Sequence, residues 1–281
     1  MTLPLARPAE GQNSHDMHPT LFRVGAYDVP SHDAFILFGV IVTALVFRHE
    51  ARRLGVWGDE RVPWIVAGTL LCGAVGARLA TVWHYVADSG DTSLGGIVLR
   101  GGRSILGGLA GAYVGAVVTK RLVDYRRRTG DLFAPAVALG MAVGRVGCFL
   151  SEPPGTPTTL PWGVRLSATQ AAAIPGCAAW CVAGPLHPSF AYEILFHLAA
   201  FAALWWWRRP RPHEEGMLFK EYLLAYAVFR FLVEFVRGNE VVWHGLTRSQ
   251  LFLIPSALLL AGYFARRHAG AGFGASFSVR P

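Results

Sequence analysis

The chain has 281 residues, of which 53% are hydrophobic and only 16% are charged, and its formal net charge is +8. Long apolar runs separated by short charged clusters are typical of a polytopic helical membrane protein and exclude an ordinary soluble α/β domain. Most Lys and Arg residues lie in the connecting segments, where the positive-inside bias explains them, so the positive charge does not indicate nucleic-acid binding. We therefore expect an all-α integral membrane protein with about seven transmembrane helices and a small extracytoplasmic loop region.

Residues 1–31 hold no apolar run, so we expect an irregular extracytoplasmic arm and no cleavable signal peptide. Residues 32–266 are expected to form a membrane domain that includes an extracytoplasmic loop, 151–187, and residues 267–281 a cytoplasmic tail. The seven expected spans are 33–47, 63–85, 101–118, 132–150, 189–207, 217–236 and 249–264.

The charge pattern predicts the orientation of these spans. The segments after the first, third, fifth and seventh spans are rich in Arg and Lys, whereas the N-terminal arm and the other loops carry few. Because short cytoplasmic loops carry the excess of basic residues, we expect the N-terminus outside the cytoplasm and the C-terminus inside.

Six ionisable residues lie within or at the edges of the spans, where each costs about 2.5–3.5 kcal/mol at the membrane centre on insertion scales. Given the predicted orientation, all six fall in the outer half of the bilayer or at its outer edge, which favours one shared site. Four arginines against two glutamates leave about two positive charges in excess, which suits an anionic lipid head group. The alternative is a set of structural ion pairs, for instance Arg230 with Glu193. The six residues are Arg78, Arg103, Arg145, Glu193, Arg230 and Glu234.

Several neighbouring residues allow two interpretations. Tyr226 lies one helical turn before Arg230 and is either part of the site or an ordinary core aromatic. Gly107 and Gly108 favour close helix packing, with lipid approach to the backbone as the alternative. Arg103 precedes the third span at a helix N-terminus, where backbone N–H groups suit a phosphate. Ser189 is expected to be a plain N-cap of the fifth span.

The four cysteines show no paired CxxC spacing, so we expect no zinc site, no other metal and no cofactor. Cys177 and Cys181 lie in the extracytoplasmic loop, where either a local disulfide or two free thiols are compatible with the sequence.

One segment of the chain carries a family signature. Residues 144–155 read Gly-Arg-Val-Gly-Cys-Phe-Leu-Ser-Glu-Pro-Pro-Gly. Together with His-Pro-Ser-Phe-Ala-Tyr-Glu at 187–193, Tyr-x-x-x-Arg-Phe-Leu-Val-Glu-Phe-Val-Arg at 226–237 and Gly-Leu-Thr-Arg-Ser-Gln at 245–250, this segment resembles the prolipoprotein diacylglyceryl transferase family of bacterial membranes. The resemblance covers most of the chain, from about Gly76 to the seventh span.

The resemblance implies a seven-span enzyme of the bacterial plasma (inner) membrane. It implies transfer of the diacylglyceryl group of phosphatidylglycerol to the lipobox cysteine of a prolipoprotein signal peptide, with release of glycerol 1-phosphate. The essential phosphate-binding arginines of the family correspond to Arg145 and Arg230, which we expect to be catalytic. Expected substrate-binding residues are Arg103, Gly107, Gly108, Glu152, Tyr192, Glu193, Tyr226, Glu234 and Arg237.

The chain also departs from the family pattern. Cys148 and Ser151 stand where the signature has Asn, and His32 lies near a position where the family often has Tyr. Leu106 replaces a His or Tyr that many members carry, and that His, where present, is the favoured general base. Because leucine cannot accept a proton, the base must be water or another group such as Glu152.

Two alternative functions follow from these departures. The first is a non-catalytic phospholipid- or lipoprotein-binding relative that retains the phosphate site. The second is a small-anion transporter, which the lack of internal repeats disfavours.

Overall fold

The computed structural model describes residues 20–25, 27–99, 104–174, 176–177 and 179–275. The chain divides into two compact units. The first unit comprises Met1–Phe47 and Gly130–Pro281, and the second comprises Arg48–Thr129. Among the described residues, six helices are long and apolar enough to cross a membrane, and the only sheets are two short two-stranded ones. The expected all-α membrane fold is thus confirmed.

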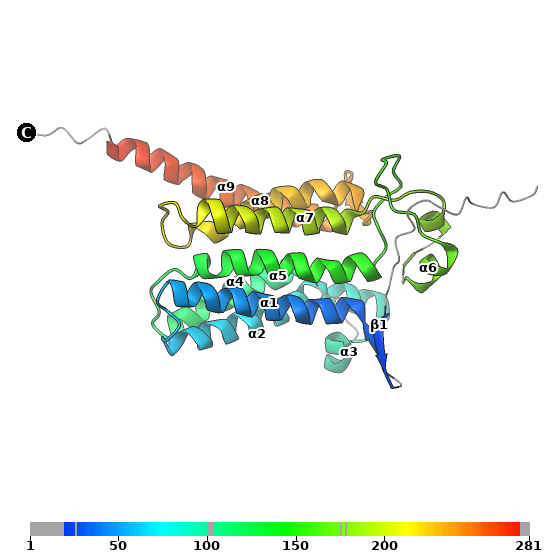
Figure 1. Cartoon of the computed structure of the whole chain (residues 1–281), viewed down its shortest axis with the longest axis horizontal. Helices are drawn as coiled ribbons and strands as arrows, with labels where there is room; N and C mark the ends of the chain where they lie inside the picture. The colour runs from blue at the N-terminus through cyan, green and yellow to red at the C-terminus, as the bar shows by residue number, and fades with distance from the viewer. Residues whose placement is uncertain (1–19, 26, 100–103, 175, 178, 276–281) are drawn as a thin grey trace, which may run out of the picture. The chain divides into compact units, whose positions relative to one another are not determined.

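The first unit begins with a hairpin of β1 (Thr20–Val24) and β2 (Tyr27–Pro30), which leads into α1 (Ser31–Arg53). Its other membrane helices are α5 (Gly130–Ser151), α7 (Ser189–Ala202) with its π-helical continuation Ala203–Arg208, α8 (Met217–Val233) and α9 (Arg248–Ala275). Helix α5 packs against α7 and α8, and α8 against α9 (Figure 1). Smaller elements of this unit are α6 (Ala168–Ala173), the 3-10 turns Ala179–Val182 and Glu234–Val236, β3 (Val241–Trp243) and β4 (Leu246–Thr247).

The second unit is built around α2 (Arg61–Ser89) and α4 (Ile105–Leu122), with the short α3 (Leu94–Leu99) between them in sequence. Gly107, Gly111 and Gly115 are spaced four apart and face α2. A Cβ atom on Gly111 would lie only 2.2 Å from the Cys72 carbonyl oxygen, and one on Gly107 only 2.4 Å from the Cβ atom of Ala80. Small residues at this spacing let two helix backbones approach closely in lipid. The close-packing interpretation of Gly107 is therefore confirmed.

The structure corrects several expected boundaries. The arm is not irregular throughout, because residues 20–24 and 27–30 pair as the β1–β2 hairpin and α1 begins at Ser31. Within the described residues the third span begins at Ile105, with the Ser104 hydroxyl accepting a hydrogen bond from the Gly107 N–H as its N-cap. The sixth span, by contrast, agrees with the expected range 217–236: α8 has 17 residues, about 26 Å of α-helix, and the 3-10 turn that follows adds about 6 Å. This total length suffices for a hydrocarbon core of about 30 Å.

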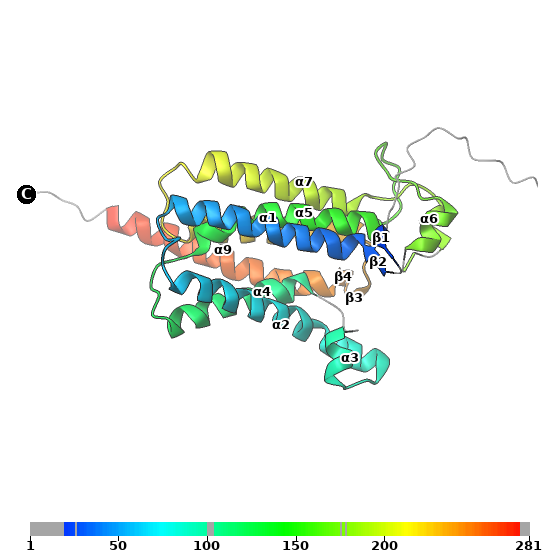
Figure 2. The same ribbon diagram turned by 60° about the horizontal axis from the view of Figure 1, so that its bottom comes forward.

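The long loop of the first unit has a small core of its own. Leu166, Ile174, Cys181 and Leu186 pack together, and α6 is opened by a capping box in which Ser167 and Gln170 exchange hydrogen bonds. Cys177 and Cys181 form a disulfide, which decides between the two alternatives that the sequence left open. In two views α6 lies beyond the end of α5 and α7 (Figures 1 and 2).

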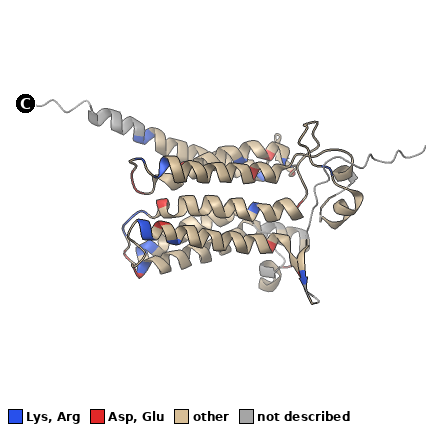
Figure 3. Ribbon diagram, viewed as in Figure 1, with Lys and Arg blue, Asp and Glu red and all other residues tan. Residues whose placement is uncertain are grey.

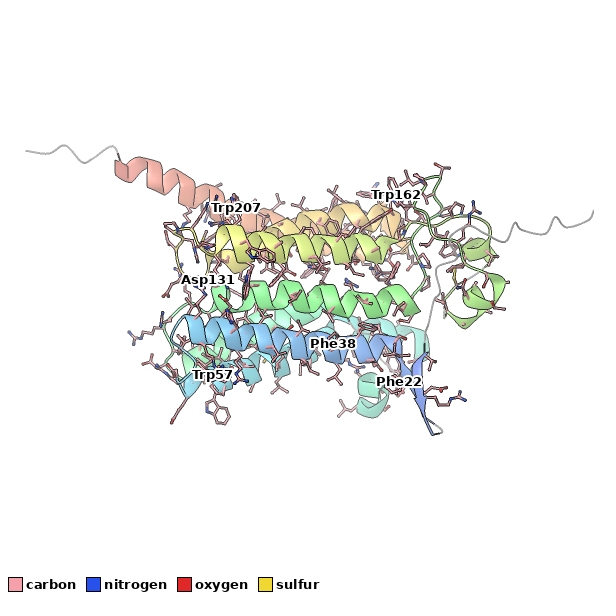
Figure 4. The ribbon with its side chains drawn as sticks, in the orientation of Figure 1. Phe22, Phe38, Trp57, Asp131, Trp162 and Trp207 are labelled. Carbon is pink, nitrogen blue, oxygen red and sulfur yellow. A yellow bond between two sulfur atoms is a disulfide. The ribbon has the colours of Figure 1, made fainter. Side chains whose placement is uncertain are left out.

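Charged residues mark the other end of the helices in each unit. In the second unit, Lys and Arg gather where α2 begins and α4 ends (Figure 3). In the first unit, Arg208 pairs with Glu221 at 2.5 Å, and the Asp131 carboxylate accepts hydrogen bonds from the N–H groups of Gly216 and Leu218. Asp131 lies at the opposite end of this unit from Trp162 of the long loop (Figure 4). The basic and loop-covered ends of the first unit are therefore distinct.

Candidate functional site

Three helices of the first unit each present a row of polar side chains near the loop-covered end. Positions three or four apart lie on one face of a helix, so each row points in one direction. Every one of these side chains is buried except that of Glu152, which is half-buried. The rows are Arg145, Cys148 and Glu152 at the end of α5; Ser189, Glu193 and His197 on α7; and Tyr222, Tyr226, Arg230 and Glu234 on α8 and the turn that follows it.

Glu193 is the centre of the charge network. Its carboxylate contacts Nη2 of Arg145 at 2.5 Å and Nη1 of Arg237 at 2.6 Å. Glu193 is fully buried and Arg145 only 4% exposed, so neither charge is screened by water. Both guanidinium groups lie over the Phe190 ring, at 5.9 Å for Arg145 and 4.3 Å for Arg237. The phenyl face and the carboxylate together hold the two arginines in fixed orientations.

The example given from the sequence paired Arg230 with Glu193, but the structure gives Arg230 a different partner. It pairs with Glu234 one turn later and not directly with Glu193, although its charge also acts on Glu193. Glu234 in turn accepts hydrogen bonds from the Thr247 hydroxyl at 2.7 Å and the Asn239 amide at 2.9 Å. This network connects the end of α8 to the turn that precedes α9.

Backbone hydrogen bonds hold the loop after α5 against the segment before α7 and the turn after α8. The Gly155 N–H donates to the His187 carbonyl at 2.7 Å, and the Thr156 N–H donates to the Val236 carbonyl at 2.8 Å. A Cβ atom on Gly155 would lie 1.9 Å from that Val236 oxygen, so only glycine permits the approach. As a result Glu152 lies beside Arg237, with Oε2 and Nη2 3.8 Å apart.

Several buried polar atoms beside this network have no hydrogen-bond partner among the described protein atoms, including the Ser189 hydroxyl and His197 Nε2. Two others, Nε of Arg145 and the hydroxyl of Tyr226, belong to side chains that also interact with each other. Buried polar groups are satisfied in most native structures, so such a pair indicates a place for polar atoms of a ligand. Tyr226 also contacts His197, with ring centroids 4.9 Å apart, and His197 Nδ1 lies 3.0 Å from the Tyr222 hydroxyl.

The structure brings together Arg145, Glu193, Arg230 and Glu234, as the shared depth in the membrane predicted. Arg145 lies six residues before the end of α5 and Glu193 four residues after the start of α7, which corresponds to about 9 Å and 6 Å of helix. Arg78 belongs to the second unit, and Arg103 lies outside the described residues.

The expected positive excess is not found in the described part of this cluster. Three arginines (145, 230 and 237) face three glutamates (152, 193 and 234). The excess predicted from four arginines and two glutamates counted Arg78 and Arg103 and left out Arg237 and Glu152. Anion binding at this cluster must therefore use donor geometry more than net charge.

The remaining expected site residues lie in different places. Tyr192 on α7 accepts a hydrogen bond from the Trp162 indole at 2.9 Å and lies 3.2 Å from His187 Nδ1, which connects α7 to the long loop. Gly107 and Gly108 belong to α4 in the second unit, where Gly107 contacts α2. Ser189 is not the N-cap of α7, because Pro188 precedes the helix and the Ser189 hydroxyl is buried with no hydrogen-bond partner among the described atoms.

Sequence reasoning missed His197 and treated His32 only as a departure from the family pattern, not as a site residue. His197 follows Glu193 by four residues on an apolar helix, and this spacing was the available signal. His32 enters the site from the start of α1, where its Nε2 lies 3.5 Å from Glu152 Oε1. His32, Cys148 and Glu152 form a group whose ligand atoms all lie within 4.8 Å of one another, an arrangement that could hold a metal ion. No spacing motif predicts it, because His32 comes from a distant segment.

Comparison with known proteins gives one consistent result. The family model for prolipoprotein diacylglyceryl transferase matches residues 19–266. The chain is 32% identical over 259 residues to a phosphatidylglycerol–prolipoprotein diacylglyceryl transferase of Chromohalobacter salexigens, covering 86% of this chain and 90% of the relative. Proteins of the same name from Bordetella parapertussis and Cereibacter sphaeroides are 33% and 35% identical, covering 88% and 74% of this chain and 94% and 76% of the relatives.

Proposed function

Because this chain belongs to the prolipoprotein diacylglyceryl transferase family, we propose that it transfers the diacylglyceryl group of phosphatidylglycerol to the lipobox cysteine thiol of a prolipoprotein. The sulfur of the cysteine attacks the glycerol carbon that bears the phosphate ester, a thioether forms, and glycerol 1-phosphate leaves. The names of the relatives contain both substrates, phosphatidylglycerol and prolipoprotein.

The observation that carries the proposal is the environment of Arg145. Its guanidinium is buried, aligned by Glu193 and in interaction with Tyr226, yet its Nε has no hydrogen-bond partner among the described atoms. A phosphate group offers several acceptor oxygens and pairs well with a guanidinium. Arg145 is thus placed to bind the lipid phosphate without rearranging its own support.

Preorganised positive charge also accelerates the proposed reaction. Negative charge grows on the phosphate as the carbon–oxygen bond breaks, and fixed donors in a water-poor site stabilise it most. We assign this role to Arg145 and Arg230, with Glu193 and Glu234 keeping their guanidinium groups in place. We assign Arg237, Tyr192, Tyr226 and Glu152 to the surrounding substrate site, and Arg103, Gly107 and Gly108 to lipid contacts made by the second unit.

The proposed location is the bacterial inner membrane, with the N-terminus outside the cytoplasm and the C-terminus inside. The support within the first unit is the position of basic residues at helix ends opposite the site, such as Arg208 after α7 and Arg267 late in α9, which is the pattern of cytoplasmic ends. This orientation places Arg145 and the long loop on the outer side, where a prolipoprotein cysteine arrives after export.

The test is a two-product assay with the full chain in phosphatidylglycerol vesicles and a synthetic lipobox peptide. We expect release of glycerol phosphate in equal amount to the lipidated peptide, and neither product with a peptide in which serine replaces the cysteine. Lipid binding without release would overturn the enzymatic proposal and indicate a non-catalytic relative.

A single substitution tests whether Arg145 binds the phosphate. Arg145→Ala is expected to lower the rate at least ~100-fold, in the range observed for removing one preorganised donor to a developing anion. Arg126→Ala is the matched control, because Arg126 is an exposed arginine that pairs with the exposed Asp124. An Arg145→Ala rate close to that of the unaltered chain would contradict the assignment.

A further inference from the structure

His32, Cys148 and Glu152 converge at the loop-covered end of the first unit. Cys148 and Glu152 are four residues apart at the end of α5, and His32 is the second residue of α1. The two helices touch here because Gly147 has no side chain: a Cβ atom on it would lie 3.0 Å from the His32 Cα atom. Helix packing, not local sequence, therefore brings the imidazole to the thiol and the carboxylate.

A thiolate, an imidazole and a carboxylate are together a donor set typical of zinc. For a tetrahedral zinc ion with ordinary bond lengths, two donor atoms lie about 3.4–3.6 Å apart. His32 Nε2 and Glu152 Oε1 are 3.5 Å apart, and all three ligand atoms lie within 4.8 Å of one another. The thiol therefore needs to approach by at most about 1.4 Å. Three protein ligands leave a fourth position open, which distinguishes a catalytic zinc site from a structural one.

Each of the three groups also has an outer partner that orients it. His32 Nδ1 lies 3.3 Å from the Asp33 carboxylate, which turns Nε2 toward the other two groups. Arg145 Nη1 donates to Cys148 Sγ at 3.8 Å, and Arg237 Nη2 lies 3.8 Å from Glu152 Oε2. A carboxylate behind a metal-binding histidine and hydrogen bonds to the other ligands are the usual support of a metal site.

The nearby arginines do not prevent cation binding. Glu193 contacts both Arg145 and Arg237, at 2.5 Å and 2.6 Å, and its single charge offsets one of the two. A thiolate at Cys148 and the Glu152 carboxylate supply two negative charges, which balance the two positive charges of a zinc ion. The ion's charge is thus balanced by its own ligands, while the whole cluster, in which Glu152 also faces Arg237, gains one net positive charge.

We propose that His32, Cys148 and Glu152 bind one zinc ion whose open position takes the thiol of the acceptor cysteine as a thiolate. The inference rests on the proposed transferase function and supplies what Leu106 cannot: activation of the thiol without a protein base. A thiol that coordinates zinc loses its proton, here to solvent. An electron pair of the sulfur then forms the carbon–sulfur bond, and the electrons of the breaking carbon–oxygen bond leave with the phosphate. The step needs no oxidant or reductant. The sequence expectation of no metal considered only the spacing of cysteines.

The test begins with metal content. We expect the full chain, purified in detergent and dialysed against metal-free buffer, to retain about one zinc ion per chain. His32→Ala and Cys148→Ser should each reduce this to below ~0.1. Cys72→Ser is the matched control, because Cys72 is the other free cysteine outside this group and should leave the zinc content unchanged. Zinc that persists in Cys148→Ser would be adventitious and would contradict the proposal.

Cobalt(II) titration of the unaltered, metal-free chain gives a test that does not depend on the folding of a variant. We expect a thiolate-to-cobalt charge-transfer band that saturates at one cobalt per chain and is displaced by zinc. Absence of this band would overturn the site.

The two proposals fail in distinguishable ways. A chain that binds zinc at His32, Cys148 and Glu152 but releases no glycerol phosphate would refute the transferase function and leave the metal site standing. A zinc-free chain that transfers diacylglyceryl at the full rate would refute the metal site and leave the function standing.

Discussion

The α2–α4 pair and the α5–α7–α8 group differ in the residues that make their helix–helix contacts. In the second unit, Gly107, Gly111 and Gly115 of α4 lie against α2 so closely that a Cβ atom would meet its backbone or side chains at 2.2–2.4 Å. In the first unit, α5, α7 and α8 meet around buried arginines and glutamates. Both regions are apolar on the outside, so their difference lies in the contact surfaces alone.

The comparison indicates why the charges are present. Close contact of small residues is sufficient to associate two helices in lipid, as α2 and α4 do. Buried ion pairs, by contrast, are often neutral or unfavourable relative to apolar residues of similar size. The ionised side chains of α5, α7 and α8 are therefore not needed to hold helices together, and their retention indicates chemistry.

The largest effect is expected when the central ion pair is replaced by apolar residues. The double variant Arg145→Met/Glu193→Leu should be less destabilised than Glu193→Leu alone, because only Arg237 then loses this carboxylate. It should lose at least ~100-fold in transfer rate, because the phosphate donor is removed. The single variant Glu193→Leu should cost about 3–5 kcal/mol in unfolding free energy, since it leaves the buried Arg145 and the part-buried Arg237 without their carboxylate. Thermal unfolding in detergent and the lipidation assay measure the two quantities. Equal destabilisation of the double and single variants would mean that the pair is structural after all.

A smaller loss is expected from Gly155→Ala. The added methyl group would lie 1.9 Å from the Val236 carbonyl oxygen, so the loop must move and carry Glu152 away from Arg237. We expect the transfer rate to fall about 10-fold through displaced substrate groups. Gly184→Ala in the same loop meets no atom within 4 Å and should change the rate less than ~2-fold. Similar rates for both variants would show that the fastening of this loop is unimportant.

The smallest effect on the reaction is expected from Gly111→Leu in α4. The new side chain would overlap the backbone of α2 at Cys72, and overpacking of this kind costs about 1–3 kcal/mol. The thermal midpoint should fall while the rate per folded molecule changes less than ~3-fold. Gly262→Leu on α9, where a Cβ atom meets open space, is the control. A loss of activity without a loss of stability would show that α4 contributes directly to the reaction.

The helices could be predicted because hydropathy and flanking charge are local properties. Buried charges such as Arg145 and Glu193 were also visible, since an ionised residue in an apolar helix must have a partner or a function. Their common depth follows from counting residues along helices of alternating direction. The hairpin of residues 20–24 and 27–30 was less accessible, because brief strands carry weak patterns.

The amino-acid sequence by itself determined the membrane class, the family and the residue types of the site. Only the tertiary structure decided their partners: Glu193 with Arg145 and Arg237, Arg230 with Glu234, and His32 with Cys148 and Glu152. Several arginines and glutamates lie at one depth with equal charge, so periodicity cannot choose among them. The choice depends on how each helix is rotated and how closely its neighbours approach, which Gly147 and Gly155 set through contacts with segments far away in the chain.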